Sequence, residues 1–322
     1  MPKLRFSTEI GDYTIFRKFL GCSLSLLLSL GLFTACQDNK KNADGKLDVV
    51  TTTTMITDLV KNIGRDSVNV QGLMGSGVDP HLYKASEGDV SKLTGADVVF
   101  YSGLHLEGKL VDVFEKMGRN STTIALAEVL DKEGLIGSEY FASSYDPHIW
   151  FNIEYWKQIT EYLTEELSRI DPENASFYED NKEEYLQKLD VLEDDIRQTI
   201  ATLPEEKRVL VTAHDAFSYF GEEYGFEVVG LQGLSTATEA GVQDVQRLAQ
   251  LIIDKQVKSI FVETSVPKRT IEALQKAVNS KGYDVAIGGT LYSDALGNAG
   301  TEEGTYLGMF RYNVNTIVEA LK

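Results

Sequence analysis

Four polar side chains in widely separated loops could together bind one metal ion. His81, His148 and His214 are three of the chain's four histidines, and Asp294 lies in a fourth loop near the C-terminus. Imidazole nitrogens and carboxylate oxygens are the usual protein ligands of Zn²⁺ and related divalent ions. Each of the four residues lies near the beginning or end of an expected strand or helix. We therefore expect the four side chains to converge in one cleft.

The expected secondary structure supports this convergence. Each candidate is at the boundary of a regular element: His81 after a strand at 68–74, His148 before a helix starting near Ile153, His214 at the end of a strand at 208–213, and Asp294 after a strand at 283–289. In open parallel sheets, ligands bind beyond the carboxyl ends of the strands. Two candidates come from each half of the chain, so a bound ion would join the halves.

Two Asp-Pro-His triplets, 79–81 and 146–148, add a backbone argument. Proline fixes its own φ and restricts the residue before it, which stiffens the loop that carries the histidine. Asp79, Asp146 or Asp215 could accept the second ring N–H of a ligand histidine and thereby set its tautomer.

Two further residues are reserve candidates. His105 also follows an expected strand but lacks a neighbouring proline, and we expect it to pack against or cap the next helix. Glu263, at the end of a strand at 257–263, could be a ligand or could instead accept hydrogen bonds at the cleft.

The N-terminal segment has the pattern of a bacterial export signal. Arg17 and Lys18 precede an apolar run of about 15 residues, which is shorter than the roughly 20 that span a bilayer. Residues 33–36 resemble a lipobox, so we predict a lipoprotein signal peptide over 1–35 and acylation of Cys36. A permanent transmembrane segment, or a free or disulfide-bonded Cys36, is the alternative. Residues 36–46 are polar and are expected to form a flexible tether.

Composition excludes several classes of function. The formal net charge is −18, and the leader carries four basic and two acidic residues, so the mature chain would be near −20. Nucleic acid is therefore not an expected partner. The only other cysteine, Cys22, lies in the leader, which leaves the mature chain without an intramolecular disulfide or a thiolate metal site. We expect a monomer.

Beyond the tether, β-branched runs alternate with amphipathic stretches, which is typical of an α/β protein with mainly parallel sheets. We predict two Rossmann-like β/α lobes, 47–171 and 204–322, joined by one long helix at 172–203. Asp171 as N-cap and Pro172 at the first helical position would begin this helix. The alternative is a helical hairpin broken near Leu189.

The chain closely resembles the TroA-like metal-binding lipoproteins, which are the solute-binding components of bacterial zinc and manganese ABC importers. The resemblance runs from about Leu47 to Leu321 and rests on the stretches MGSGVDPHLYKASEGDVSKLTGADVVFYSGLHLEGK, DPHIWFN, RVLVTAHDAFSYFGEEYGFEVVGLQGLSTATEA and SDALGNAGTEEGTYLGM. It implies that the four ligand positions of the family are occupied by His81, His148, His214 and Asp294, with the ion buried between two lobes.

The resemblance also implies a transported ligand and partners. The ligand would be Zn²⁺ or Mn²⁺, the partner an ABC permease, and the location extracytoplasmic, with a lipid anchor in a bacterial membrane. Manganese members often have glutamate where this chain has His214, and zinc members often have a long His-rich loop. This chain has neither feature, so both metals stay open.

Two other functions were weighed. A mononuclear zinc hydrolase also uses three histidines, but Asp294 would nearly close the coordination shell, and the sequence has no HExxH motif. A surface adhesin has no independent support in the sequence. We therefore expect a binding protein rather than an enzyme.

Overall fold

The computed structural model describes residues 45–117, 122–138 and 143–322. All of these lie in one compact unit, Lys41–Lys322. The predicted signal peptide 1–35, the predicted acylation of Cys36 and all but the last two residues of the predicted tether 36–46 lie outside the described residues. Among the helices in the described ranges, none has both the length and the apolar character needed to span a bilayer.

The N-terminal part of the fold is built on a four-stranded parallel sheet. Its order is β2-β1-β3-β4, with β1 at Leu47–Thr51, β2 at Val68–Gly72, β3 at Val98–Tyr101 and β4 at Thr122–Ala125. Valines of β1 and β3 are fully buried, as expected for parallel strands that are covered on both faces. Strand β4 was not predicted, because only one of its four residues is buried and its apolar signal is weak.

The C-terminal part contains two parallel strand pairs. They are β5 with β6 and β7 with β8, at Val209–His214, Glu227–Gln232, Ser259–Glu263 and Ala286–Leu291. Every residue of β5 is buried, and β5 lies against β7. Strand β8 begins and ends later than the predicted 283–289. The α/β class with parallel sheets is confirmed.

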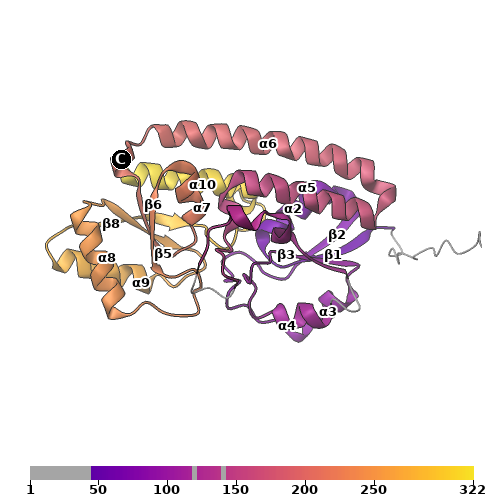
Figure 1. Cartoon of the computed structure of the whole chain (residues 1–322), viewed down its shortest axis with the longest axis horizontal. Coiled ribbons are helices and arrows are strands. Elements are labelled where there is room, and N and C mark those ends of the chain that lie inside the picture. Colours follow the sequence, from indigo (N-terminus) through magenta and orange to yellow (C-terminus); the bar gives the residue numbers. More distant parts are fainter. Residues whose placement is uncertain (1–44, 118–121, 139–142) are drawn as a thin grey trace, which may run out of the picture. The chain divides into compact units, whose positions relative to one another are not determined.

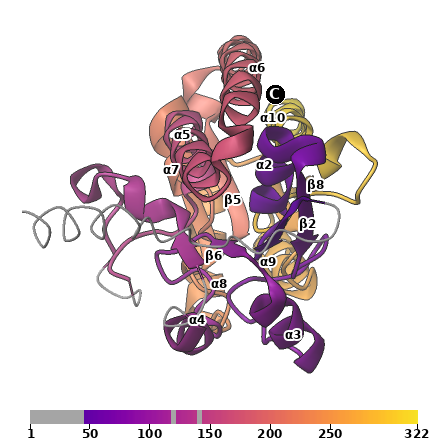
Figure 2. The same ribbon diagram turned by 90° about the vertical axis from the view of Figure 1, so that its right-hand side faces the viewer.

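Helices cover these sheets (Figures 1 and 2). They are α2 at Thr54–Gly64, α3 at Glu87–Gly95, α4 at Val111–Met117, α5 at Ile153–Ile170, α7 at Ser218–Tyr224, α8 at Val242–Asp254, α9 at Arg269–Ser280 and α10 at Tyr306–Leu321. Helix α5, which follows His148, begins with a side-chain cap. The Asn152 side chain accepts the backbone N–H of Tyr155 and thereby fixes the start of α5 just after His148.

The long helix predicted at 172–203 is present but shorter. Helix α6 covers Ala175–Ala201, 27 residues, and is preceded by a 3₁₀ turn at Pro172–Asn174. At 1.5 Å per residue it is about 40 Å long. The prediction that Asp171 caps it was wrong, because this carboxylate instead accepts the hydroxyl of Tyr178 at 2.8 Å. The helix continues unbroken through Leu189, so the helical-hairpin alternative is excluded.

Helix α6 packs on α5, α2 and α10. In both ribbon views it lies at the top, outside these three helices (Figures 1 and 2). One apolar cluster runs through all of these elements; its fully buried members include Leu59, Leu163, Leu192, Phe220 and Phe310. Burying a side chain of this size contributes about 1.5–3 kcal/mol. The cluster contains residues that precede α6 in the sequence and residues that follow it. The division into lobes at 47–171 and 204–322 therefore stays a prediction.

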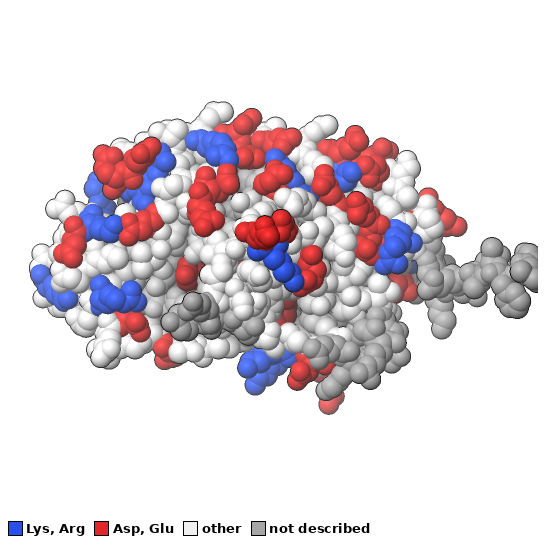
Figure 3. Space-filling view, in the orientation of Figure 1, with Lys and Arg blue, Asp and Glu red and all other residues white. Residues whose placement is uncertain are grey.

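The surface agrees with the acidic composition. In Figure 3, Asp and Glu side chains are spread over α5 and α6, with Lys and Arg side chains interspersed among them. Several of the opposite charges pair, as Lys157 does with Asp190 and Glu193. Ion pairs at the surface contribute little stability individually.

Candidate metal centre

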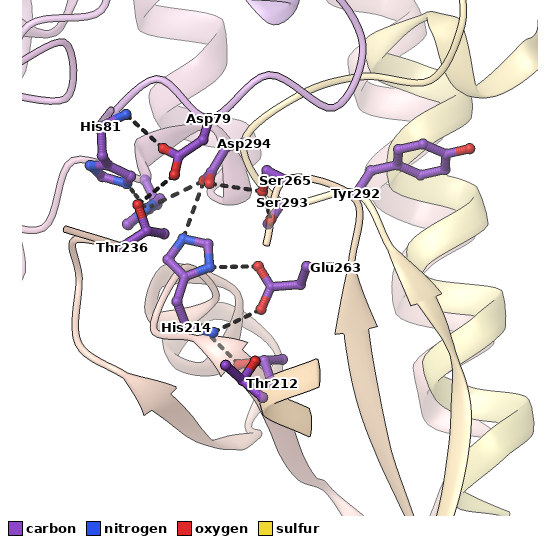
Figure 4. Close-up of polar contacts among 12 residues, drawn as sticks. Asp79, His81, Thr212, His214, Thr236, Glu263, Ser265, Tyr292, Ser293 and Asp294 are labelled. Atoms are coloured by element: carbon purple, nitrogen blue, oxygen red, sulfur yellow. Dashed lines mark hydrogen bonds and ion pairs between the residues drawn. The ribbon is translucent and has the colours of Figure 1, made fainter. Parts of the chain in front are cut away.

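The four predicted residues meet at one point inside the protein. One ligand atom from each of His81, His148, His214 and Asp294 lies within 4.8 Å of the others. His148 and His214 are 0% exposed, Asp294 is 1% exposed and His81 is 5% exposed. His214 is the last residue of β5, His148 directly precedes a short 3₁₀ turn before α5, and the other two lie in loops after β2 and β8. The four side chains therefore converge as predicted, and Figure 4 shows three of them, His81, His214 and Asp294, close together.

Three of the six distances between these atoms are close to those of tetrahedral coordination. Bonds of 2.0–2.1 Å to a tetrahedral ion place neighbouring ligand atoms about 3.3 Å apart. The Nε2 atoms of His81 and His148 are 3.3 Å apart. Asp294 Oδ1 lies 3.3 Å from Nε2 of His214 and 3.6 Å from Nε2 of His148. The four side chains could therefore surround one ion with little rearrangement.

Two of the facing atoms are buried without a hydrogen bond. Among the residues that the structure describes, Nε2 of His214 and Oδ1 of Asp294 have no hydrogen-bond partner. The other carboxylate oxygen of Asp294 accepts the hydroxyl of Ser265 at 3.0 Å. An unsatisfied buried polar atom costs about 1–3 kcal/mol. A cation between the four residues would satisfy both atoms at once.

Carboxylates hold two of the imidazoles from behind. Asp146 Oδ1 lies 2.7 Å from Nδ1 of His148, and Glu263 Oε2 lies 2.5 Å from Nδ1 of His214. Glu263 also accepts the backbone N–H of His214 at 2.9 Å. When Nδ1–H donates to a carboxylate, the lone pair is on Nε2, which faces the centre. Asp146 therefore accepts the ring N–H of His148, as predicted. Of the two roles predicted for Glu263, ligand or hydrogen-bond acceptor, the structure shows the second.

The other two predicted acceptors act differently. Asp79 accepts the backbone N–H of His81 at 2.8 Å and the hydroxyl of Thr236, but the structure gives it no bond to an imidazole. Asp215 accepts the hydroxyl of Ser218 at 2.7 Å. Adjacency in sequence therefore identified the ring acceptor for His148 but not for His214, whose partner Glu263 comes from strand β7.

The charges around the centre favour a cation. Burial lowers the pKa of His81 to about 3, with the other imidazoles adding to this effect and Asp294 opposing it. Burial also opposes a charge on His214, but Asp294 and Glu263 outweigh it and raise the pKa of His214 well above its usual value. Burial would raise the pKa of Asp294, yet the neighbouring imidazoles hold it well below its usual range. Positive charge at the centre, from a protonated His214 or from a bound cation, is therefore stabilised by its carboxylates.

His105 is placed apart from this group. It is exposed and in left-handed backbone conformation, with φ of 63°. It is not one of the four residues whose ligand atoms converge.

Trp150 was not identified from the sequence, although it lies only two residues after His148. Its indole ring is 5.3 Å from the His148 ring, and its Nε1 donates to the carbonyl of Ser293, next to Asp294, at 2.9 Å. The hydroxyl of Tyr306 donates to the Trp150 carbonyl at 2.7 Å. These buried bonds tie one candidate ligand from each part of the chain to the same scaffold.

Comparison with known proteins agrees with this geometry. A family model described as zinc-uptake complex component A, periplasmic (ZnuA), matches residues 49–320. Manganese-binding lipoprotein MntA of Bacillus subtilis is 49% identical over 304 residues, covering 94% of this chain and 99% of MntA. Zinc-binding protein TroA of Treponema pallidum is 45% identical over 304 residues, covering 94% of this chain and 98% of TroA.

The fold agrees as well. The solved structure of the periplasmic zinc-binding protein TroA from Treponema pallidum superimposes with a TM-score of 0.84 and 46% sequence identity, covering 86% of this chain and 99% of TroA. A match over 94% of the chain in sequence and 86% in fold shows that this protein belongs to the family described as zinc-uptake complex component A, ZnuA.

Proposed function

We propose that this protein captures a divalent transition metal, Zn²⁺ or Mn²⁺ or both, outside the cytoplasmic membrane and delivers it to the permease of an ABC importer. His81, His148, His214 and Asp294 are the proposed ligands. The observation that carries the proposal is the convergence of four buried ligand atoms within 4.8 Å, two of which, His214 Nε2 and Asp294 Oδ1, face each other at 3.3 Å without a hydrogen bond.

The relatives support both metals. One similar protein is named for manganese and another for zinc. At a given site of nitrogen and oxygen ligands, affinity rises from Mn²⁺ to Zn²⁺. We therefore propose that this centre binds Zn²⁺ more tightly, and that supply decides which ion it carries.

Capture and release require no bond to be made or broken in a substrate. The matching family is described as a zinc-uptake component, and a similar protein of Streptococcus mitis is named as a manganese ABC transporter substrate-binding lipoprotein. Four protein ligands leave a tetrahedral ion no open position for an activated water, which argues against the hydrolase alternative. Release follows when the ligand set is spread, and a small shift of one loop is enough because coordination is sensitive to distance.

We further propose that the protein acts as a monomer held at the membrane by acylation of Cys36. The support for the anchor is the lipobox-like sequence at 33–36 and the description of similar proteins as lipoproteins. One lipid-modified cysteine with several acyl chains would keep the binding protein near its permease.

The test is direct measurement of metal binding and of the ligand set. The chain without its leader, stripped with EDTA, is titrated with Zn²⁺, Mn²⁺ and, as a control, Mg²⁺. We expect one equivalent of Zn²⁺ or Mn²⁺ and no tight binding of Mg²⁺. X-ray absorption of the zinc-loaded protein should show nitrogen and oxygen neighbours at about 2.0–2.1 Å with imidazole scattering. Absence of tight binding of both transition metals would refute the proposal.

A further inference from the structure

One partly buried hydrogen bond crosses between two loops at the edge of the metal centre. Thr236 lies in the loop between β6 and α8, and its hydroxyl donates to Oδ2 of Asp79 at 2.5 Å. The other oxygen of Asp79 accepts the backbone N–H of His81 at 2.8 Å. Figure 4 shows the Asp79 carboxylate between the Thr236 hydroxyl and His81. A single carboxylate thus connects the C-terminal part of the chain to a proposed ligand of the N-terminal part.

His81 is the ligand through which the ion could leave. It is 5% exposed, whereas the other three are 0–1% exposed, and the next residue, Leu82, is 46% exposed. His148 and His214 are each held by a buried carboxylate at the ring and at the backbone N–H. Asp79 holds His81 at its backbone N–H. Movement of its loop would open the ligand set and leave the others in place.

The loop that carries Thr236 borders an open surface pocket of about 490 Å³. Residues of the loop, among them Leu234 and Thr238, line this pocket together with Asp215 and Arg247. A segment beside such a hollow lacks part of the close packing that would otherwise hold it in one position. In contrast, the link from Trp150 to Ser293 is buried. The Thr236 bond is therefore a contact between the two parts that can open without disturbing the core.

We propose that Thr236 is a positioning residue that slows metal release: its hydroxyl holds Asp79, Asp79 holds the backbone of His81, and loss of the hydroxyl lets the ion leave faster. The inference rests on the proposed function, since it concerns the lifetime of the bound ion. The proline between Asp79 and His81 fixes one backbone angle, so a shift of Asp79 is transmitted to His81.

Zinc release tests the proposal. Full-length mature protein loaded with one equivalent of Zn²⁺ is mixed with excess 4-(2-pyridylazo)resorcinol, and release is followed by the absorbance of the zinc complex. Thr236→Val keeps the shape and removes the hydroxyl, Thr236→Ser keeps the hydroxyl, and Thr238→Val makes the same change at an exposed site in the same loop. We expect about tenfold faster release from T236V, the size of one hydrogen bond to a charged group.

T236S and T238V should release zinc at the wild-type rate, and T236V without metal should melt within about 4 °C of the wild-type temperature, the shift expected for one lost hydrogen bond. Release from T236V as slow as from wild type would overturn the proposal. So would equal acceleration in T238V, or failure of T236S to restore the rate, because either would indicate general loosening of the loop. If T236V does not fold, T236A is judged by the same criteria. Wild-type protein that binds no zinc would instead refute the proposed function itself.

Discussion

Replacing Glu263 by glutamine would change one oxygen into an amide nitrogen in the residue that holds His214. The two oxygens of Glu263 accept two different N–H groups, the ring Nδ1–H and the backbone N–H of His214, at 2.5 and 2.9 Å. Glutamine has only one oxygen. In either orientation of its amide, one N–H group of the protein would face an NH₂ group.

The backbone N–H cannot move, but the imidazole can exchange its tautomer. We therefore expect the glutamine oxygen to face the backbone and its NH₂ to face the ring. The ring then accepts at Nδ1 and carries its proton on Nε2, the nitrogen that should bind the ion. To bind the ion, the ring must move this proton back to Nδ1, which breaks its hydrogen bond with the glutamine and costs about 1–3 kcal/mol. This cost corresponds to about a ten- to a hundredfold larger dissociation constant for zinc. Loss of an outer partner of a metal-binding histidine generally has this magnitude.

Competitive zinc titration of E263Q against a chelator of known affinity measures this change. Glu239→Gln is the matched control, because it removes the same charge at a site that is 72% exposed and pairs with Arg269. We expect weaker binding only in E263Q. Wild-type affinity in E263Q would refute the tautomer argument, and an equal loss in E239Q would indicate a general effect of charge.

Other changes test the ligand set, a buried acid and a close backbone contact. His214→Ala should weaken zinc binding by about a hundredfold or more, since four ligands share a binding free energy of roughly 10–16 kcal/mol. Zinc titration of His105→Ala should show almost no change, and comparable losses in the two variants would contradict the ligand assignment. Burial raises the pKa of Asp58 from 3.8 to about 6, so its ionisation opposes folding as pH rises through this window. Asp58→Asn should raise the free energy of unfolding by about 3 kcal/mol at pH 8 and by almost nothing near pH 4; urea unfolding at both pH values measures this, and equal effects would argue against the raised pKa. Gly230→Ala would place a methyl group 2.4 Å from the backbone beside the metal centre, whereas Gly233→Ala meets nothing within 4 Å. We expect G230A to lose about 1–3 kcal/mol of stability and G233A almost none, and equal thermal midpoints would refute the contact.

The location of the centre could be predicted because the signals are local. His214 follows a run of β-branched residues, and the two Asp-Pro-His triplets stiffen the loops that carry His81 and His148. The carboxyl ends of parallel strands lie at one edge of a sheet, so residues at those ends approach each other whatever the details of the core. Position along each element was enough to place all four side chains.

The contacts behind the ligands could not be predicted in the same way. Glu263 reaches His214 because β7 lies beside β5, and strand neighbours of this kind are not encoded in the local pattern. The Asp171-Pro172 pair predicted the start of the long helix, yet a 3₁₀ turn comes first and the aspartate binds Tyr178. Trp150 acts through a bond to a residue far along the chain, and only the folded structure reveals such a partner.

The apolar cluster shared by α2, α5, α6, α7 and α10 limits how this chain can be recombined with its relatives. A fragment that ended before α6 would leave apolar faces of α2 and α5 in water, and would be prone to aggregate. A chimaera that took its C-terminal segment from another member would need side chains on α10 that interlock with this α6. Exchange of surface loops should be tolerated far more readily than exchange of either half, so new metal preferences are most accessible through the loops.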